Sequence, residues 1–249
     1  MQEQADSTPQ VVDRSEAAGF PVAGGSDVHA NRPNPYVARI LQQHLVDDPA
    51  SLCWTADGTA VFVDISGFTK LSERLARKGR EGAEQITEAI GTSFEAILAV
   101  AYENGGSLLK FGGDALLMWF EGDGHATRAC RATVLMRRVL RKVGRIEVPG
   151  AQVTLRMTQG VHTGRFHFFS VGTSHFEFLP VGPAWTRLVK LEHWAVAGEI
   201  MVSPETAQFL ASSCVTGLEG RGMLLLREPG PIAGQYHRHI GGGRFASPP

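Results

Sequence analysis

Two aspartates, Asp64 and Asp114, stand at the ends of apolar runs in settings that suit metal-ion chemistry. Residues 59–65 are rich in Val, Phe and Ile, which predicts a buried strand. Asp64 lies near the end of this run, and a helical pattern opens directly after it through Ser66 and Gly67. Asp114 follows a Gly-Gly pair between two further apolar runs, a pattern typical of a hairpin tip.

Each aspartate by itself has an ordinary structural explanation. Asp64 or Ser66 could cap the helix that follows, and Gly-Gly-Asp is a common turn sequence. Together they suggest more if their strands are neighbours, since two such carboxylates can share a pair of divalent ions ~3.5–4 Å apart. The N–H groups at a helix start suit a phosphate, and a carboxylate beside a phosphate needs a cation between them. The pattern alone leaves the adjacency of the two strands open.

The apolar spacing predicts an α+β fold with a mostly antiparallel sheet and helices packed on one face. Adjacent strands in hairpins give the antiparallel order, and stripes at steps of three and four give the helices. Helices are predicted over 67–78, 83–103, 126–143, 183–195 and 204–210, after a short one that begins near residue 34. Strands are predicted over 59–65, 152–163, 166–171, 176–181, 199–203 and 223–227, with a hairpin over 107–121.

The domain boundaries follow from shifts in composition. Residues 1–33 lack periodicity and predict a disordered leader, and 34–57 predict an N-terminal helix and a connector. Residues 58–228 form the predicted globular domain, and the Gly- and Pro-rich residues 229–249 a flexible tail. The predicted helix over 126–143 has a basic outer face, which we expect to be solvated, with docking onto an acidic partner as the alternative. That face carries Arg128, Arg131, Arg137, Arg138, Arg141 and Lys142.

Composition excludes several classes of protein. The 249 residues carry a formal net charge of −1, which argues against a strongly basic nucleic-acid binder. No apolar run approaches the ~18 residues that a membrane span needs, and the polar N-terminus lacks the apolar core of a signal peptide. Three cysteines lie far apart and suggest free thiols rather than a disulfide framework or a zinc site. These features predict a cytoplasmic protein.

Two motifs together make the chain resemble the class III adenylyl and guanylyl cyclase catalytic domain over residues of about 58 to 210. It looks most like the first of two cyclase domains in bicarbonate-sensitive soluble adenylyl cyclases and their bacterial relatives. The resemblance implies the ferredoxin-like cyclase fold. The motifs are Phe62-Val63-Asp64-Ile65-Ser66-Gly67-Phe68-Thr69 and Lys110-Phe111-Gly112-Gly113-Asp114-Ala115.

The resemblance implies a head-to-tail dimer of cyclase domains with each active site at the interface. Asp64 and Asp114 would hold two Mg²⁺ or Mn²⁺ ions, with the backbone at Ile65 as a further metal ligand. The backbone of Ser66, Gly67 and Phe68 would contact the phosphates of ATP, or of GTP. The implied reaction makes cyclic AMP and pyrophosphate.

The complementary half of the site departs from the family pattern. Lys110 matches the lysine that reads the purine in the opposite site of a dimer, although it could equally be a solvated strand lysine. The second base-reading position falls on Leu179, which cannot hydrogen-bond a purine edge. Alignment on the glycine of the family's later motif places Thr186 at its asparagine and Lys190 at its arginine. A slip of one residue would bring Arg187 nearer that position.

Three functions stay open on the sequence. The chain could be the metal-donating half of a cyclase that pairs with a complementary domain. It could be a homodimeric cyclase that uses Thr186 and Lys190 as weaker substitutes, since lysine lacks the planar fork of arginine. It could also be a non-catalytic module that binds a nucleotide, a small anion or a partner protein.

Overall fold

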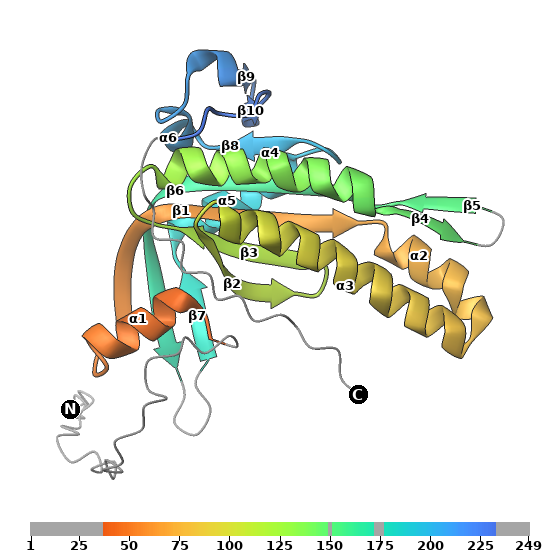
Figure 1. Cartoon of the computed structure of the whole chain (residues 1–249). Helices are drawn as coiled ribbons and strands as arrows, with labels where there is room; N and C mark the ends of the chain where they lie inside the picture. The colour runs from red at the N-terminus through yellow and green to blue at the C-terminus, as the bar shows by residue number, and fades with distance from the viewer. Residues whose placement is uncertain (1–36, 149–150, 172–176, 233–249) are drawn as a thin grey trace, which may run out of the picture. The chain divides into compact units, whose positions relative to one another are not determined.

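The structure is a computed structural model that describes residues 37–148, 151–171 and 177–232 (Figure 1). The predicted leader over 1–33 and most of the predicted tail lie outside these residues. None of the described helices combines the length and the apolar character that a membrane span requires.

The secondary structure follows the predicted order with some additions, except that the strands predicted over 152–163 and 166–171 join in one strand, Arg156–Val171. The α-helices are α1 (Arg39–Asp47), α2 (Phe68–Leu75), α3 (Arg80–Glu103), α4 (His125–Val143), α5 (Pro183–Trp194) and α6 (Pro204–Ala207). Short 3-10 helices cover Ala76–Lys78 and Ser212–Cys214. The strands are β1 (Cys53–Ser66), β2 (Gly106–Gly112), β3 (Ala115–Phe120), β4 (Arg145–Val148), β5 (Ala151–Thr154), β6 (Arg156–Val171), β7 (Glu177–Val181), β8 (Ile200–Val202), β9 (Val215–Leu218) and β10 (Gly222–Leu225).

One mixed sheet organises the domain, and it confirms the expected α+β class. Its strand order is β2-β3-β1-β6-β8-β10-β9, with β7 also paired to β6. All of these pairs are antiparallel except β6 with β8, which is parallel. A separate hairpin of β4 and β5, which the sequence analysis did not predict as a hairpin, precedes β6.

The helices lie on both faces of this sheet, not on one face as predicted. Helices α2, α3 and α4 pack on the face where Val61, Val63 and Ile65 of β1 are buried. Helices α1 and α5 pack on the other face, around Ala60 of β1 and Trp119 of β3. Side chains of a strand alternate between the two faces, and β1 places apolar residues on both. A sheet with two apolar faces must be covered on both sides.

Strand β1 begins at Cys53 and therefore includes residues 53–57, which the sequence analysis assigned to a connector. This extension pairs antiparallel with β6, from Cys53 opposite Phe169 to Gly58 opposite Gly164. Trp54 in the extension stacks on Phe168, with ring centroids 5.5 Å apart. The partner strand is far away in the sequence, so no local pattern marked this segment as a strand.

Gly160 on β6 allows α5 to lie directly against the sheet. A Cβ atom at Gly160 would lie 2.7 Å from the backbone N of Glu192 and 2.7 Å from the backbone O of Leu188, both in α5. We expect Gly160→Ala to push α5 outward and to lower the free energy of unfolding by about 1–3 kcal/mol. Chemical denaturation measures this loss.

The control for this substitution is Gly91→Ala in α3, where an added Cβ meets nothing within 4 Å. Because alanine favours a helix over glycine by about 0.5–1 kcal/mol, this variant should be at least as stable as the parent. Equal stability of the two variants would contradict the close packing of α5 on β6.

The basic face of α4 is less solvated than predicted. Arg128 is 4% exposed, and its guanidinium donates to the backbone carbonyls of Asn104 at 2.9 Å and Gly105 at 3.2 Å, among others. Arg131 and Arg138 both form ion pairs with Glu228. These arginines therefore hold the end of α3 and the segment after β10 against α4, which a helical pattern alone does not show.

Candidate active site

Asp64 and Asp114 are neighbours in the structure. Strands β1 and β3 pair antiparallel, with Asp64 opposite Ala115. The amide of Ile65 donates to the backbone carbonyl of Asp114 at 3.2 Å. The hairpin tip of β2 and β3 therefore lies beside the end of β1, which is the adjacency that the sequence left open.

Asp64 lies in a setting that opposes its negative charge. Burial raises the pKa of its carboxyl group, and the charges of Asp114 and then Glu192 raise it further. Glu192 approaches from α5 and accepts a hydrogen bond from Thr158, the residue opposite Asp64 on β6. Like charges gathered at one point are stabilised by a divalent cation.

The donors at this point fit Mg²⁺ or Mn²⁺. In the described residues, no group of three or more His, Cys, Asp or Glu side chains could hold a metal ion. The hard carboxylate oxygens of Asp64 and Asp114 lie at neighbouring strand ends and could contribute to a site that water and a substrate complete. Mg²⁺ is commonly bound through one or two carboxylates, with its other positions taken by water and by substrate phosphates.

The turn between β1 and α2 leaves the helix start open to an anion. Gly67 has φ of 110°, a conformation that favours glycine, and it precedes the first residue of α2, Phe68. No side chain caps this helix start, and the hydroxyl of Ser66 donates instead to the carbonyl of Arg156 at 3.4 Å. The capping explanation for Asp64 and Ser66 is therefore wrong, and the free N–H groups suit a phosphate.

Arg156 is a residue of this site that the sequence analysis missed. It pairs with Ser66 across β1 and β6, and Thr158 pairs with Asp64, so Arg156 and Asp64 share one face of the sheet. Arg156 is exposed, and among the described residues its side chain makes no ion pair. Arg156 lies beside the turn between β1 and α2 because of the register between β1 and β6. These strands are far apart in the sequence, so the sequence does not show this register.

Lys110 is paired with a carboxylate and is not simply solvated. It forms an ion pair with Glu177 of β7, and both side chains are 46% exposed. Leu179 lies two residues further along β7, on the same face as Glu177, and it is partly buried opposite Phe169. The carboxylate of Glu177 is thus the polar partner beside Lys110. The second base-reading position of the family pattern, Leu179, holds an apolar side chain instead.

Thr186 and Lys190 are exposed on one face of α5, one turn apart. The Thr186 hydroxyl donates to the carbonyl of Gly182 at 3.4 Å. Arg187 points elsewhere, because it forms an ion pair with Glu205 of α6. The structure therefore gives no support to the alternative alignment that would use Arg187.

Within the described residues, the two predicted groups of site residues make no direct contact through Thr186 or Lys190. Helix α5 reaches Asp64 through Glu192. Among the described contacts, Thr186 and Lys190 make no hydrogen bond or ion pair to either aspartate.

Residues 55–237 match the family model described as the adenylate and guanylate cyclase catalytic domain. The chain belongs to this cyclase family. It is 29% identical to human adenylate cyclase type 10 over 164 residues, which cover 64% of this chain and 10% of that protein. It is 28% identical to an adenylate cyclase of Anabaena cylindrica over 169 residues, which cover 64% of this chain and 32% of that protein. The chain thus spans a small part of these relatives.

The fold of this cyclase domain also matches solved cyclase structures. The adenylyl cyclase CyaB from P. aeruginosa superposes with a TM-score of 0.58 at 23% identity, covering 72% of this chain and 99% of that one. A bacterial light-regulated adenylyl cyclase superposes with a TM-score of 0.60 at 15% identity, covering 80% and 60% of the two chains. At these identities, the likeness establishes the fold.

The raised pKa of Asp64 gives this cyclase domain a testable pH dependence without metal. The folded state holds the Asp64 proton more tightly than the unfolded chain, whose pKa is near the ordinary 3.8. Stability is therefore lost as the pH rises through the folded pKa. We expect Asp64→Asn to raise the melting temperature in EDTA at pH 7, and the gain to shrink as the pH is lowered through the folded pKa toward the ordinary 3.8.

Asp57→Asn serves as the opposite case, because hydrogen bonding to Arg165 lowers the pKa of Asp57. That variant should show no gain in melting temperature at pH 7. If Asp64→Asn also gives no gain, or gives one that does not change with pH, burial and the neighbouring carboxylates do not oppose the charge of Asp64 as described.

Proposed function

We propose that this cyclase domain supplies the metal-binding half of an active site that converts ATP to cyclic AMP and pyrophosphate. We further propose that it turns over weakly or not at all without a complementary cyclase domain. The observation that carries the proposal is the meeting of Asp64 and Asp114 beside the uncapped start of α2. The adenine preference follows the named relatives, which are adenylate cyclases.

Each group of the proposed half-site has a distinct role. Asp64 and Asp114, with the carbonyl of Ile65, hold the two divalent ions. When bound, such ions activate the ribose 3′-hydroxyl and neutralise the triphosphate. The N–H groups at Gly67 and Phe68 bind phosphate oxygens at the positive end of α2.

Arg156 supports the same task from the neighbouring strand. A guanidinium offers two parallel hydrogen bonds to a phosphate, and Arg156 lies beside Ser66 on the face that carries Asp64. It would help to hold the triphosphate as pyrophosphate leaves.

Because ATP is abundant in the cytoplasm, the proposed reaction is a cytoplasmic one.

The proposed weakness of the isolated domain comes from the other half. Thr186 has a shorter reach than the family's asparagine, and Lys190 lacks the planar fork of arginine. Loss of one group that stabilises developing charge typically costs about 10²–10³ in rate. In a head-to-tail homodimer, each active site would have Thr186 in place of asparagine and Lys190 in place of arginine. Each site would also lack a hydrogen bond to the base, because Leu179 cannot form one.

The test is a cyclase assay with Mn²⁺-ATP on the pure chain, with and without a domain that supplies asparagine and arginine. We expect cyclic AMP to form well only in the mixture. The double substitution Thr186→Asn with Lys190→Arg should raise the activity of the chain alone by about 10²-fold or more, because it restores charge-stabilising groups. Absence of activity in both experiments would overturn the proposal.

A second candidate is a non-catalytic nucleotide- or anion-binding module. The ion pair of Lys110 with Glu177 favours it, because the lysine that would read a base is already engaged. Titration calorimetry with Mn²⁺-ATP beside the turnover assay separates the two candidates. Binding without turnover in any mixture would support the module.

A further inference from the structure

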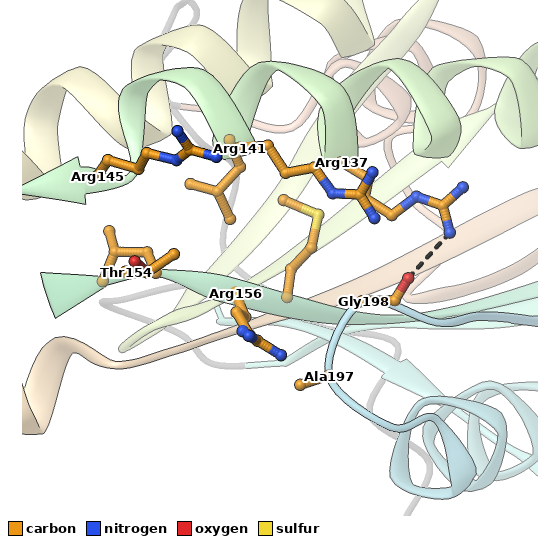
Figure 2. A pocket seen from close by; sticks show the side chains of 10 residues that line it. Arg137, Arg141, Arg145, Thr154, Arg156, Ala197 and Gly198 are labelled. Carbon is orange, nitrogen blue, oxygen red and sulfur yellow. Dashed lines mark hydrogen bonds between the residues drawn. The ribbon is translucent and has the colours of Figure 1, made fainter.

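A cavity of about 290 Å³ lies between the C-terminal half of α4 and the start of β6, apart from the proposed active site (Figure 2). Its walls include Leu140 of α4, Leu155 just before β6 and Met157 of β6, which belong to the core on the α4 side of the sheet. Such a volume is at the small end of the range for ligand sites. The cavity can hold a small molecule with some apolar surface.

Of the four arginines that line this cavity, three lie together on one side of β6 and have no acidic partner among the described residues. Arg137 and Arg141 come from α4 and Arg145 from β4, and Figure 2 shows them on one side of β6. No aspartate or glutamate lines the cavity, and within the described residues none of the three forms an ion pair. The three guanidinium groups therefore lie at one cavity, and no described acidic side chain there balances their charge.

Arg137 has an unfilled hydrogen-bonding position. One terminal nitrogen, Nη1, donates to the carbonyl of Gly198 at 2.9 Å, but its Nε atom is buried and has no partner in the described structure. Burial, followed by the charges of Arg141 and Arg138, lowers the pKa of Arg137. A buried donor without a partner is costly, and a bound anion would relieve both the missing bond and the repulsion.

The rest of the basic face of α4 does not share this arrangement. Arg128 is satisfied by backbone carbonyls, and Arg131 and Arg138 pair with Glu228. Basic residues in a last helical turn also interact favourably with the helix dipole, which applies to both Arg141 and Lys142 of α4. That effect does not explain Arg137, which lies earlier in the helix, or Arg145, which follows it.

We propose that the cavity bordered by Arg137, Arg141 and Arg145 binds a small phosphate-bearing anion. Guanidinium groups match the geometry of phosphate oxygens and offer paired hydrogen bonds. A phosphate also carries enough negative charge to offset several arginines. The shared chemistry is the phosphate group, whether it is free or carried by an organic body that packs on Leu140 and Met157.

This cavity is separate from the turn between β1 and α2, where the proposed active site would bind phosphate. Arg156 also borders the cavity, but Figure 2 draws its side chain on the opposite side of the β6 ribbon from the other three arginines. Arg156 belongs with Asp64 on that face of the sheet. The proposed anion site therefore does not depend on cyclase activity.

The test is titration calorimetry of the full chain in EDTA with pyrophosphate, inorganic phosphate and AMP. The double variant Arg141→Gln with Arg145→Gln should weaken pyrophosphate binding about tenfold or more, because hydrogen bonds to charged groups are lost. The control Arg138→Gln with Lys142→Gln removes the same charge from α4 outside the cavity. It should retain the affinity. Arg156→Gln removes a phosphate-binding group of the proposed active site and therefore reports any pyrophosphate that binds there. Thermal melts check that all variants are folded.

The outcomes separate the proposal from its alternatives. Tighter binding of AMP than of inorganic phosphate, lost in the Arg141 and Arg145 variant, would identify an organic phosphate as the ligand class. Equal losses in that variant and in the charge-matched control would mean that only general attraction acts, and would overturn the site. Loss in Arg156→Gln alone, or no binding by the parent chain, would also overturn it.

Discussion

Asp64→Asn is expected to reduce cyclic AMP formation by about 10²–10³-fold in a mixture of this domain with a complementary cyclase domain. The amide keeps the shape of the side chain but loses the charge that would hold a divalent ion next to Asp114. Asp114→Asn should have a similar effect, because the two carboxylates meet at one point. Production of cyclic AMP from Mn²⁺-ATP measures both.

The matched control is Asp123→Asn. Asp123, like Asp114, is an exposed aspartate beside glycine in a turn, but it lies between β3 and α4. Its substitution should leave the activity of the mixture unchanged. If the folded Asp64→Asn variant were as active in the mixture as the parent domain, the proposed two-metal half-site would be wrong.

The second large effect is on stability. Arg128→Ala is expected to lower the free energy of unfolding by about 3–5 kcal/mol, because it leaves several buried carbonyl groups without donors. Arg128 donates to the carbonyls of Asn104 and Gly105 at the end of α3 and to those of Glu121 and Asp123 before α4. Such a loss is a large fraction of the ~5–15 kcal/mol that stabilises a typical domain. Chemical denaturation measures it.

Arg131→Ala provides the comparison on the same helix. Arg131 is partly exposed and pairs with Glu228, so its loss should cost about 1 kcal/mol or less beyond any change in packing. Similar costs for both variants would show that the carbonyl contacts of Arg128 contribute little. Arg128→Lys should recover only part of the stability, because one ammonium cannot reach all four carbonyls.

The sequence predicted the local units of the fold well. The step from β1 to α2, the hairpin that carries Asp114, and the long helices α3 and α4 follow from residue types and spacing alone. Such units form through contacts between near neighbours in the chain, so their patterns are visible in a short window. The two carboxylates and the glycine turn after Asp64 were found in this way.

The tertiary structure decided what those units do together. The pairing of β1 with β3 brings Asp114 to Asp64, and the pairing of β1 with β6 places Arg156 beside Ser66. The approach of α5 brings Glu192 near Asp64. A helical pattern does not show which face of the sheet its helix covers, so α5 on the second face was missed.

The sequence by itself thus determined the chemistry that is available, namely two acids, a glycine turn and an altered complementary segment. Only the tertiary structure decided which of these groups meet and that Arg187 is engaged by Glu205. It also showed that a separate cavity is lined by four arginines, three of them on one side of β6. The physical reason is that strand register and helix packing join residues far apart in the chain. Alternation along a strand shows which side chains share a face. What each face contacts is known only once the neighbouring strands and helices are known.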